Sequence, residues 1–197
     1  MNSLGNDVVD LSWSPKHGDL YFKKLQSYAF TTSEKKIATG LSFADGARLL
    51  WSIKESCYKS AVKCGSTDRF KPKDFEIVQF EATDAAIFCI VNHNGQQYKS
   101  ESKTISTDVI HTVSLSIDEN FKEVITQSRV IKSIDYSSQS TSVRDMAKEY
   151  LSGYYSESIS FSKNEWGIPI VEMDGLPTAI DISFSHDQQK VGFALNL

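Results

Sequence analysis

The chain has few cysteines, no long hydrophobic run and no low-complexity tract. It contains no stretch of about 18 apolar residues that could span a membrane. Its first residues also lack the basic stretch and apolar core of a signal peptide, so we expect a cytoplasmic protein without membrane association. Cys57, Cys64 and Cys89 are odd in number and lack the spacing of a metal site. We expect them to be reduced residues of the core.

A strong positive charge is also missing. The net charge of -4 and the pI near 5.6 argue against a general nucleic-acid-binding protein. Basic residues nevertheless cluster locally, as at Lys23-Lys24 and Lys35-Lys36. Such clusters can attract an acidic partner or a phosphate, but a solvated helix face gives the same pattern, so both interpretations stay open. The 197 residues, 40% of them hydrophobic, suffice for one domain or two small lobes.

One predicted helix, residues 44–63, carries charge on an apolar face. Projected at about 100° per residue, its apolar residues fill about half the circumference. Lys54 falls inside this arc and Glu55 at its rim. A lysine on a buried face costs several kcal/mol unless an anion meets it, and that anion could belong to a ligand. In the simpler alternative, Lys54 extends to solvent along its stem, and Glu55 pairs with Lys59 for about 0.3–0.5 kcal/mol.

The remaining pattern predicts an α+β fold. Thr31 and Glu34 form a capping box that opens a short helix ending at Gly40. Residues 75–117 are typical of β-structure, with a hairpin at Asn94-Gly95. The later elements are a strand-like stretch over 124–134, a linker over 135–141, a helix capped by Ser142 and Asp145, a strand over 180–185, and a strand over 191–195 that follows a hairpin at 187–190. We therefore expect two units, residues 1–120 and 121–197, each an antiparallel sheet packed with helices and related by pseudo-symmetry.

Three short motifs carry the candidate chemistry. The first is the strand Gly5-Asn-Asp7-Val-Val-Asp10, and the second is Trp51-Ser-Ile-Lys54-Glu55-Ser-Cys-Tyr-Lys59. In the third, Gly167-Ile-Pro169 precedes the Ser-x-Ser-His end of a strand. This strand end would present Ser185 and His186 where the strand meets a loop, although a single histidine is often only structural.

These motifs, in this order, resemble those of the 4'-phosphopantetheinyl transferase superfamily. Members of that superfamily move the phosphopantetheine arm of coenzyme A onto a serine of a carrier protein. The order is similar to that of the holo-acyl-carrier-protein-synthase type, where a Gly-Ile-Asp-Ile-Val-Glu strand comes first and a Ser-His strand last. Phe30-Thr-Thr-Ser-Glu34 is similar to the Phe-Thr-x-x-Glu of that type. The helix looks more like the Trp-Thr-x-Lys-Glu of the larger surfactin-synthetase-activating type, whose length the chain shares.

The resemblance implies a set of site residues. Asp7 and Glu55 match the ligands of a Mg2+ ion, which takes carboxylates, waters and phosphate oxygens. Glu55 is also the candidate base for the carrier serine. The remaining matches concern coenzyme A: Lys54, Lys59, Ser185 and His186 at its phosphates, and Gly167 with Pro169 beside its adenine. The implied protein is a monomer of two lobes, with coenzyme A and an acidic acyl or peptidyl carrier protein as its partners.

The chain departs from the family pattern at two positions. Asp10 stands one residue beyond the second acid of the larger type, and on a regular strand it would face away from Asp7. Ile168 replaces a common lysine. No motif assigns Arg48 or Arg144, although either could meet the 3'-phosphate. The sequence therefore leaves open a non-catalytic relative that binds coenzyme A or a carrier protein, and, less favoured, an unrelated α+β domain.

Overall fold

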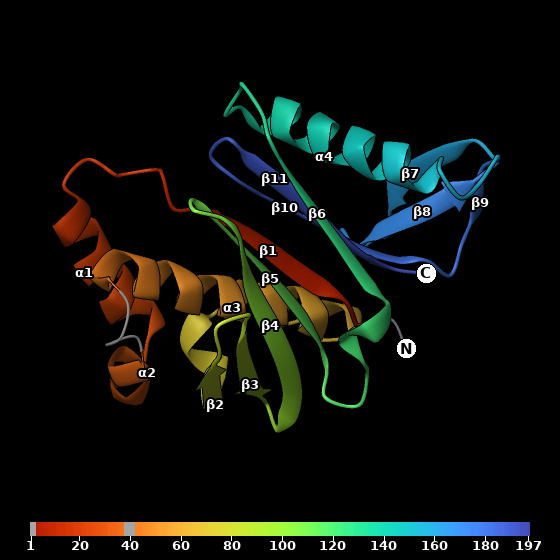
Figure 1. The fold of residues 1–197 in the computed structure, drawn as a ribbon. Coiled ribbons are helices and arrows are strands. Elements are labelled where there is room, and N and C mark those ends of the chain that lie inside the picture. The colour runs from red at the N-terminus through yellow and green to blue at the C-terminus, as the bar shows by residue number, and fades with distance from the viewer. Residues whose placement is uncertain (1–2, 38–41) are drawn as a thin grey trace.

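The computed structural model describes residues 3–37 and 42–197 (Figure 1). The chain forms antiparallel sheets together with a separate run of helices and the later helix before β7, so the α+β prediction is confirmed. The first part of the chain forms a five-stranded antiparallel sheet of order β1-β5-β4-β3-β2. The bounds of these strands are Gly5–Asp10 (β1), Glu76–Ala82 (β2), Ile87–His93 (β3), Gln96–Ser106 (β4) and Val109–Ser116 (β5). The β3–β4 hairpin turns at Asn94-Gly95, as predicted, and both residues have positive φ.

The long helix α3 (Phe43–Lys63) packs on this sheet and supplies much of its core. Ser42 caps the helix by accepting a hydrogen bond from the Asp45 amide at 3.1 Å. A short 3-10 helix, η2 (Pro72–Asp74), follows before β2. The prediction of a helix over residues 44–63 is confirmed.

Two further helices precede α3. The sequence motifs did not predict α1 (Gly18–Ala29). The shorter α2 (Thr32–Ile37) begins at the predicted capping box, where the Thr31 amide donates to Glu34 Oε2 at 2.8 Å and the Glu34 amide donates to Thr31 Oγ1 at 3.3 Å. Gly40, the predicted end of this helix, lies outside the described residues.

The rest of the chain forms two three-stranded antiparallel sheets and the helix α4 (Tyr136–Leu151), which packs on the first of them. A 3-10 helix, η3 (Phe121–Glu123), leads into these strands. The sheets have the orders β10-β11-β6 and β7-β8-β9. Their strands are Val124–Val130 (β6), Ile159–Lys163 (β7), Pro169–Met173 (β8), Leu176–Pro177 (β9), Asp181–Asp187 (β10) and Lys190–Asn196 (β11).

Two predictions about α4 are wrong. The segment 135–141 is not a linker, because it forms the first turns of α4, and Ser142 is not the cap, because it lies inside the helix. The cap is Asp135, whose Oδ1 accepts a hydrogen bond from the Ser138 amide at 2.9 Å. The Ser, Thr and Tyr residues of this segment have modest helix propensity, but the N-cap and the packing of α4 against β10 and β11 are enough to hold them in a helix.

The two parts of the chain meet where β1 runs along β10 and β11 (Figure 1). β1 is an edge strand of its sheet, and its outward backbone amides need partners. Side chains of β10 supply them. The Leu4 amide donates to Asp181 Oδ2 at 2.8 Å, the Asn6 amide to Ser183 Oγ at 3.1 Å and the Asp10 amide to Asp187 Oδ2 at 2.9 Å.

This contact explains the alternation of polar and apolar residues in β10. Successive side chains of a strand point to opposite faces, so the polar residues Asp181, Ser183 and Asp187 face β1 together. Ile182 belongs to the buried cluster beneath α4, and Phe184 packs against the same cluster. The strand therefore joins the two parts of the chain through one face and closes the second core through the other.

The boundary predicted at residue 120 falls between β5 and β6. The two parts differ in strand number and helix number over the described residues, and the division into two folding units and their pseudo-symmetry stay predictions. No helix in residues 3–37 or 42–197 is long and apolar enough to cross a membrane.

Candidate active site

The two acids predicted as metal ligands converge on one lysine. Lys59 Nζ lies 3.6 Å from Asp7 Oδ1 and 3.5 Å from Glu55 Oε1, and it donates a hydrogen bond to the Asn6 carbonyl at 2.8 Å. The distance between Asp7 Oδ1 and Glu55 Oε1 therefore cannot exceed the sum of these two ion-pair distances. β1 supplies Asp7 and α3 supplies Glu55 and Lys59, so the packing of that helix on that strand assembles the cluster.

Gly5 allows this close packing. A Cβ atom on Gly5 would overlap the Ser56 carbonyl oxygen and lie 2.7 Å from the Ser60 nitrogen. Both are backbone atoms of α3, which cannot turn aside as a side chain could. Glycine at this position therefore lets α3 approach β1 closely enough for Lys59 to reach Asp7.

Trp51 holds Glu55 from the previous turn of α3. Its indole Nε1 donates a hydrogen bond to Glu55 Oε2 at 2.8 Å, while Oε1 faces Lys59. The Trp51 ring packs edge-on against Phe70. The spacing of tryptophan and glutamate, four residues apart on a helix, is therefore what fixes the carboxylate.

The electrostatics of Asp7 favour a bound cation. The Asp7 side chain is almost fully buried, and burial together with the charge of Glu55 raises its pKa well above the ordinary value. Lys59 offsets only part of this effect. Two carboxylates facing one space suit Mg2+, which takes one or two carboxylates and completes its shell with water and phosphate oxygens. Among the described residues, no group of three or more histidines, cysteines or acids could hold a metal by itself.

Asp10 does not join this pair. Its Oδ1 accepts hydrogen bonds from the Ser12 amide at 3.0 Å and from Ser12 Oγ at 2.5 Å, in the segment that follows β1. Asp187 acts on the pair through its charge, which adds to the raised pKa of Asp7 after the larger effects of burial and Glu55. Its own pKa is raised by burial. The motifs gave no reason to single out Asp187.

Lys54 is not where a phosphate contact would require it to be. The side chain is completely buried, and Nζ lies 2.7 Å from Glu34 Oε1. It also donates to the Pro72 carbonyl at 2.8 Å and the Phe75 carbonyl at 2.7 Å, which uses all three ammonium hydrogens. The anion that meets Lys54 is thus the capping-box glutamate of α2, and not a ligand.

Ser185 is also placed in the interior. Its Oγ accepts a hydrogen bond from Asn6 Nδ2 at 2.9 Å and donates one to the Gly192 carbonyl at 3.3 Å. It lies on the face of β10 that meets β1, whereas His186 lies on the opposite face. The prediction that Ser185 contacts coenzyme A phosphate therefore does not agree with the structure.

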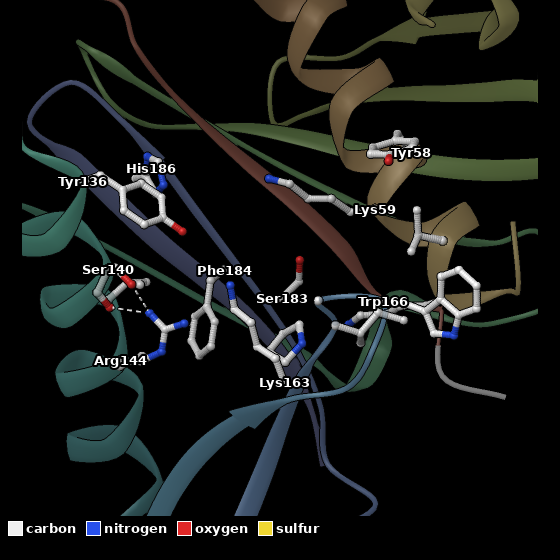
Figure 2. A pocket seen from close by; sticks show the side chains of 16 residues that line it. Tyr58, Lys59, Tyr136, Ser140, Arg144, Lys163, Trp166, Ser183, Phe184 and His186 are labelled. Carbon is white, nitrogen blue, oxygen red and sulfur yellow. Dashed lines mark hydrogen bonds between the residues drawn. The ribbon is translucent and has the colours of Figure 1, made fainter. Parts of the chain in front are cut away.

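A pocket of about 280 Å³ opens between α3, α4, the β7–β8 loop and β10 (Figure 2). His186, Lys59, Gly167 and Pro169 all line it, so four of the predicted coenzyme A contacts meet in one place. Partial burial and the charge of Lys59 lower the pKa of His186. The other lining residues are Tyr58, Val62, Lys63, Tyr136, Ser140, Val143, Arg144, Lys163, Trp166, Ile168, Ser183 and Phe184.

The pocket is basic and aromatic. Lys59, Arg144, Lys163 and the buried Lys63 line it, and none of the described residues in its lining is an acid. Lys63 is already paired with Asp181, at 2.5 Å. The Arg144 guanidinium donates to the Ser140 carbonyl at 2.8 Å, and it lies over the Phe184 ring, 5.3 Å from the ring centroid.

Arg48 is not part of the pocket. Its guanidinium donates to the Leu11 carbonyl at 2.9 Å and to the Trp13 carbonyl, and it lies over the Phe22 ring. These contacts hold the segment between β1 and α1 against α3. Of the two arginines considered for the 3'-phosphate, only Arg144 is in place to meet a ligand of the pocket.

Sequence reasoning missed several lining residues. Tyr136 and Lys163 belong to no motif, although Tyr136 packs edge-on against His186. Tyr136 fell in the segment assigned as a linker, so the error in the start of α4 concealed it. Trp166 directly precedes the Gly167-Ile-Pro169 motif, which was a usable signal.

Residues 3–115, more than half of the chain, match the family model of the 4'-phosphopantetheinyl transferase superfamily. No match to a curated protein was found. The matched region contains β1 and α3, and so contains Asp7, Glu55 and Lys59. The chain belongs to the 4'-phosphopantetheinyl transferase superfamily.

Proposed function

We propose that this protein transfers the 4'-phosphopantetheine arm of coenzyme A to a serine of an acyl or peptidyl carrier protein, in a reaction that requires Mg2+. The observation that carries the proposal is the position of Lys59. Its ammonium lies beside Asp7 and Glu55 and also lines the basic pocket, so the paired acids and the pocket are adjacent.

In this proposal the pocket holds the nucleotide end of coenzyme A. Lys59, His186, Arg144 and Lys163 face the phosphates as positive or hydrogen-bonding groups, and Gly167-Ile-Pro169 lies beside the adenine. A pyrophosphate linkage brings several negative charges, which the basic lining can offset. Because one chain supplies all sides of the pocket, the arrangement supports a monomer as the working unit.

Asp7 and Glu55 would hold Mg2+, whose charge would stabilise the pyrophosphate as the phosphorus–oxygen bond between its two phosphates breaks. Glu55 would take the proton of the carrier serine, a role supported by the partial exposure of its carboxylate and by its hydrogen bond from Trp51. The serine oxygen then bonds to the phosphorus of the arm. The phosphorus–oxygen bond to adenosine 3',5'-bisphosphate breaks, and the bisphosphate leaves.

Surface charge supports an acidic carrier as the partner. Lys23 and Lys24 on α1 and Lys35 and Lys36 on α2 are all exposed. Besides these lysines, α1 also exposes Leu20 (54%) and Tyr28 (61%). A mixed basic and apolar surface of this kind favours an acidic protein over a small ligand.

The direct test is the intact mass of apo-carrier proteins after incubation with the enzyme, coenzyme A and Mg2+. A carrier should gain the mass of the phosphopantetheine arm. Glu55→Gln should lose this activity, while Glu157→Gln, at an exposed acid outside the pocket, should keep it. If no carrier gains mass although the protein binds coenzyme A, transfer is refuted.

A non-catalytic relative that binds coenzyme A is the second candidate. Two observations favour it: Asp10 turns away from the paired acids, and Ile168 stands where the family commonly has a basic residue. The same test separates the two candidates, since a scaffold would bind coenzyme A and leave every carrier unmodified.

A further inference from the structure

His186 enters the pocket from β10 without a hydrogen-bonding neighbour that fixes its ring. Its backbone is held by the pairing of β10 with β11, where His186 stands opposite Val191. Among the described residues, its imidazole has no hydrogen bond to another residue, and its one such contact is with its own backbone. That contact ties the ring to its own strand but to no other wall of the pocket. The orientation of the imidazole within the pocket therefore depends on packing.

Tyr136 supplies this packing from a different element. It is the first residue of α4, and its ring meets the His186 imidazole edge-on, with the ring centroids 5.4 Å apart and the ring planes at 81°. Figure 2 shows the two rings side by side at one end of the pocket. Edge-on contact is a favoured geometry of aromatic pairs, and one such pair can favour one ring orientation by about 3-fold to 10-fold. In the described part of the chain, no other aromatic ring packs on His186.

The core of the second sheet does not need the Tyr136 side chain. It is 65% exposed, and within residues 3–37 and 42–197 no hydrogen bond engages its hydroxyl. The start of α4 is fixed instead by Asp135, which caps the helix, and residues further along α4, such as Val143 and Met146, are the ones buried against the sheet. The contact with His186 is therefore the main packing contact that the structure gives the Tyr136 ring.

The orientation of His186 matters because Lys59 lines the same pocket from α3. A phosphate bound between α3 and β10 would meet the Lys59 ammonium on one side and an imidazole nitrogen on the other. The ammonium presents three donors, whereas an imidazole nitrogen donates or accepts only along one direction in the plane of its ring. A change in the ring orientation of His186 would therefore cost this contact, while Lys59 could still follow the anion.

We propose that Tyr136 is a positioning residue, which holds the His186 imidazole in the orientation that meets the phosphates of coenzyme A across from Lys59. The inference rests on the proposed function, because it assigns a role within the same pocket. Tyr136 acts through His186, so it contributes nothing to binding once that imidazole is removed. This dependence distinguishes it from a residue that contacts coenzyme A directly.

A double-mutant cycle measures this dependence. Calorimetric titrations with coenzyme A compare the wild type, Tyr136→Ala, His186→Ala and the double variant. Tyr136→Ala alone should weaken binding about 3-fold to 10-fold, whereas in the His186→Ala background it should change the affinity by less than about 2-fold. Tyr136→Phe should bind nearly as well as the wild type, because the ring remains, and Tyr136→Leu should resemble Tyr136→Ala. Tyr154→Ala is the matched control, since it removes a 63% exposed tyrosine whose ring packs on Tyr150 outside the pocket.

Proton NMR of the ligand-free protein tests the ring contact without coenzyme A. The ring signals of His186 are identified by their loss in His186→Ala. They should shift in Tyr136→Ala and Tyr136→Leu, because the aromatic ring beside the imidazole is gone. In Tyr136→Phe and Tyr154→Ala they should stay close to their wild-type positions.

Each outcome bears on the proposal. Equal weakening by Tyr136→Ala in both backgrounds would overturn it, because Tyr136 would then act on the ligand itself or on the pocket as a whole. Unchanged coenzyme A affinity or unshifted His186 signals in Tyr136→Ala would also overturn it, and so would a Tyr136→Phe variant as weak as Tyr136→Ala, which would assign the effect to the hydroxyl. Wild-type protein that binds no coenzyme A would overturn the proposed function, and the NMR signals would then decide by themselves whether Tyr136 positions the imidazole.

Discussion

Replacing Gly5 with alanine tests whether the packing of α3 on β1 assembles the site. The new methyl group would overlap the Ser56 carbonyl oxygen and sit 2.7 Å from the Ser60 nitrogen, where ordinary contacts are 3.4–4 Å. The Ser56 oxygen is the closer of the two atoms, and an ordinary contact with it would require the backbone of α3 to retreat by about 1.4 Å. Because Lys59 and Glu55 lie on this helix, they would move away from Asp7 with it.

The size of the effect follows from this displacement. Overpacking of a close contact costs about 1–3 kcal/mol, of which the lower chain entropy of alanine recovers about 0.5–1 kcal/mol. For a chain of this length, the melting temperature should fall by about 2–8 °C. A misplacement of about 1 Å in a catalytic group can lower the rate about 100-fold, so activity should suffer more than stability.

Three measurements on Gly5→Ala check the reasoning: thermal unfolding, the Mg2+-induced shift of the melting temperature, and carrier modification by intact mass. Gly18→Ala is the matched control, because a methyl group there would meet no atom closer than 4.0 Å and would only extend the first turn of α1. We expect the Mg2+ shift to be lost in Gly5→Ala and kept in Gly18→Ala. A Gly5→Ala protein with full stability, metal response and activity would refute the proposed role of the contact.

Three other changes probe single groups. The raised pKa of Asp7 means that the native state keeps a proton that the unfolded chain has lost, so the stability of the metal-free protein should fall as pH rises above about 4. Mg2+ at about 100 times its Kd should add about 2.7 kcal/mol to the free energy of unfolding at pH 8 and less at pH 5.5. In thermal-shift titrations, Asp7→Asn should abolish both the pH effect and the Mg2+ effect. Lys54→Met should lower the free energy of urea unfolding by about 3–5 kcal/mol, because it leaves Glu34 buried without its cation. Adding Glu34→Gln should restore part of that stability, and an unchanged stability of Lys54→Met would contradict the buried pair. Trp51→Phe should lower kcat about 10-fold to 100-fold with KM for coenzyme A nearly unchanged, since it removes the hydrogen bond to Glu55 and keeps an aromatic ring. An effect confined to KM would argue against the role of Trp51 in positioning the Glu55 carboxylate.

Local patterns predicted the elements that build the first part of the site. The apolar arc over residues 44–63 gave α3 almost to the residue, and the capping box gave the start of α2. The Asn94-Gly95 turn gave the β3–β4 hairpin. Each of these signals depends on neighbours within a few residues, which is why they can be read without tertiary structure.

The partner of Lys54 could not be read in the same way. The sequence showed that a buried lysine needs an anion, but it did not show which one. Glu34 was already assigned to a capping box, where one carboxylate oxygen has a local role. Its other oxygen binds both Lys54 and the Ile77 amide, and this triple contact exists only after α2, α3 and β2 have packed together.

β10 shows most clearly why a motif can be recognised while its role is misjudged. The alternation over residues 180–185 predicted the strand, which spans 181–187, and a polar face of a strand is usually taken to face solvent or a ligand. Here that face supplies acceptors to the free edge of β1, so Ser185 belongs to the contact between sheets and His186 to the pocket. The contact accounts for the position of the pocket: by fixing β10 against β1, it brings His186 to the same opening as Lys59, which pairs with the acid of β1. The free edge of β1 needs partners for its backbone amides, and β10 supplies them. The same contact therefore places the two sides of the proposed site, Lys59 and His186, opposite each other.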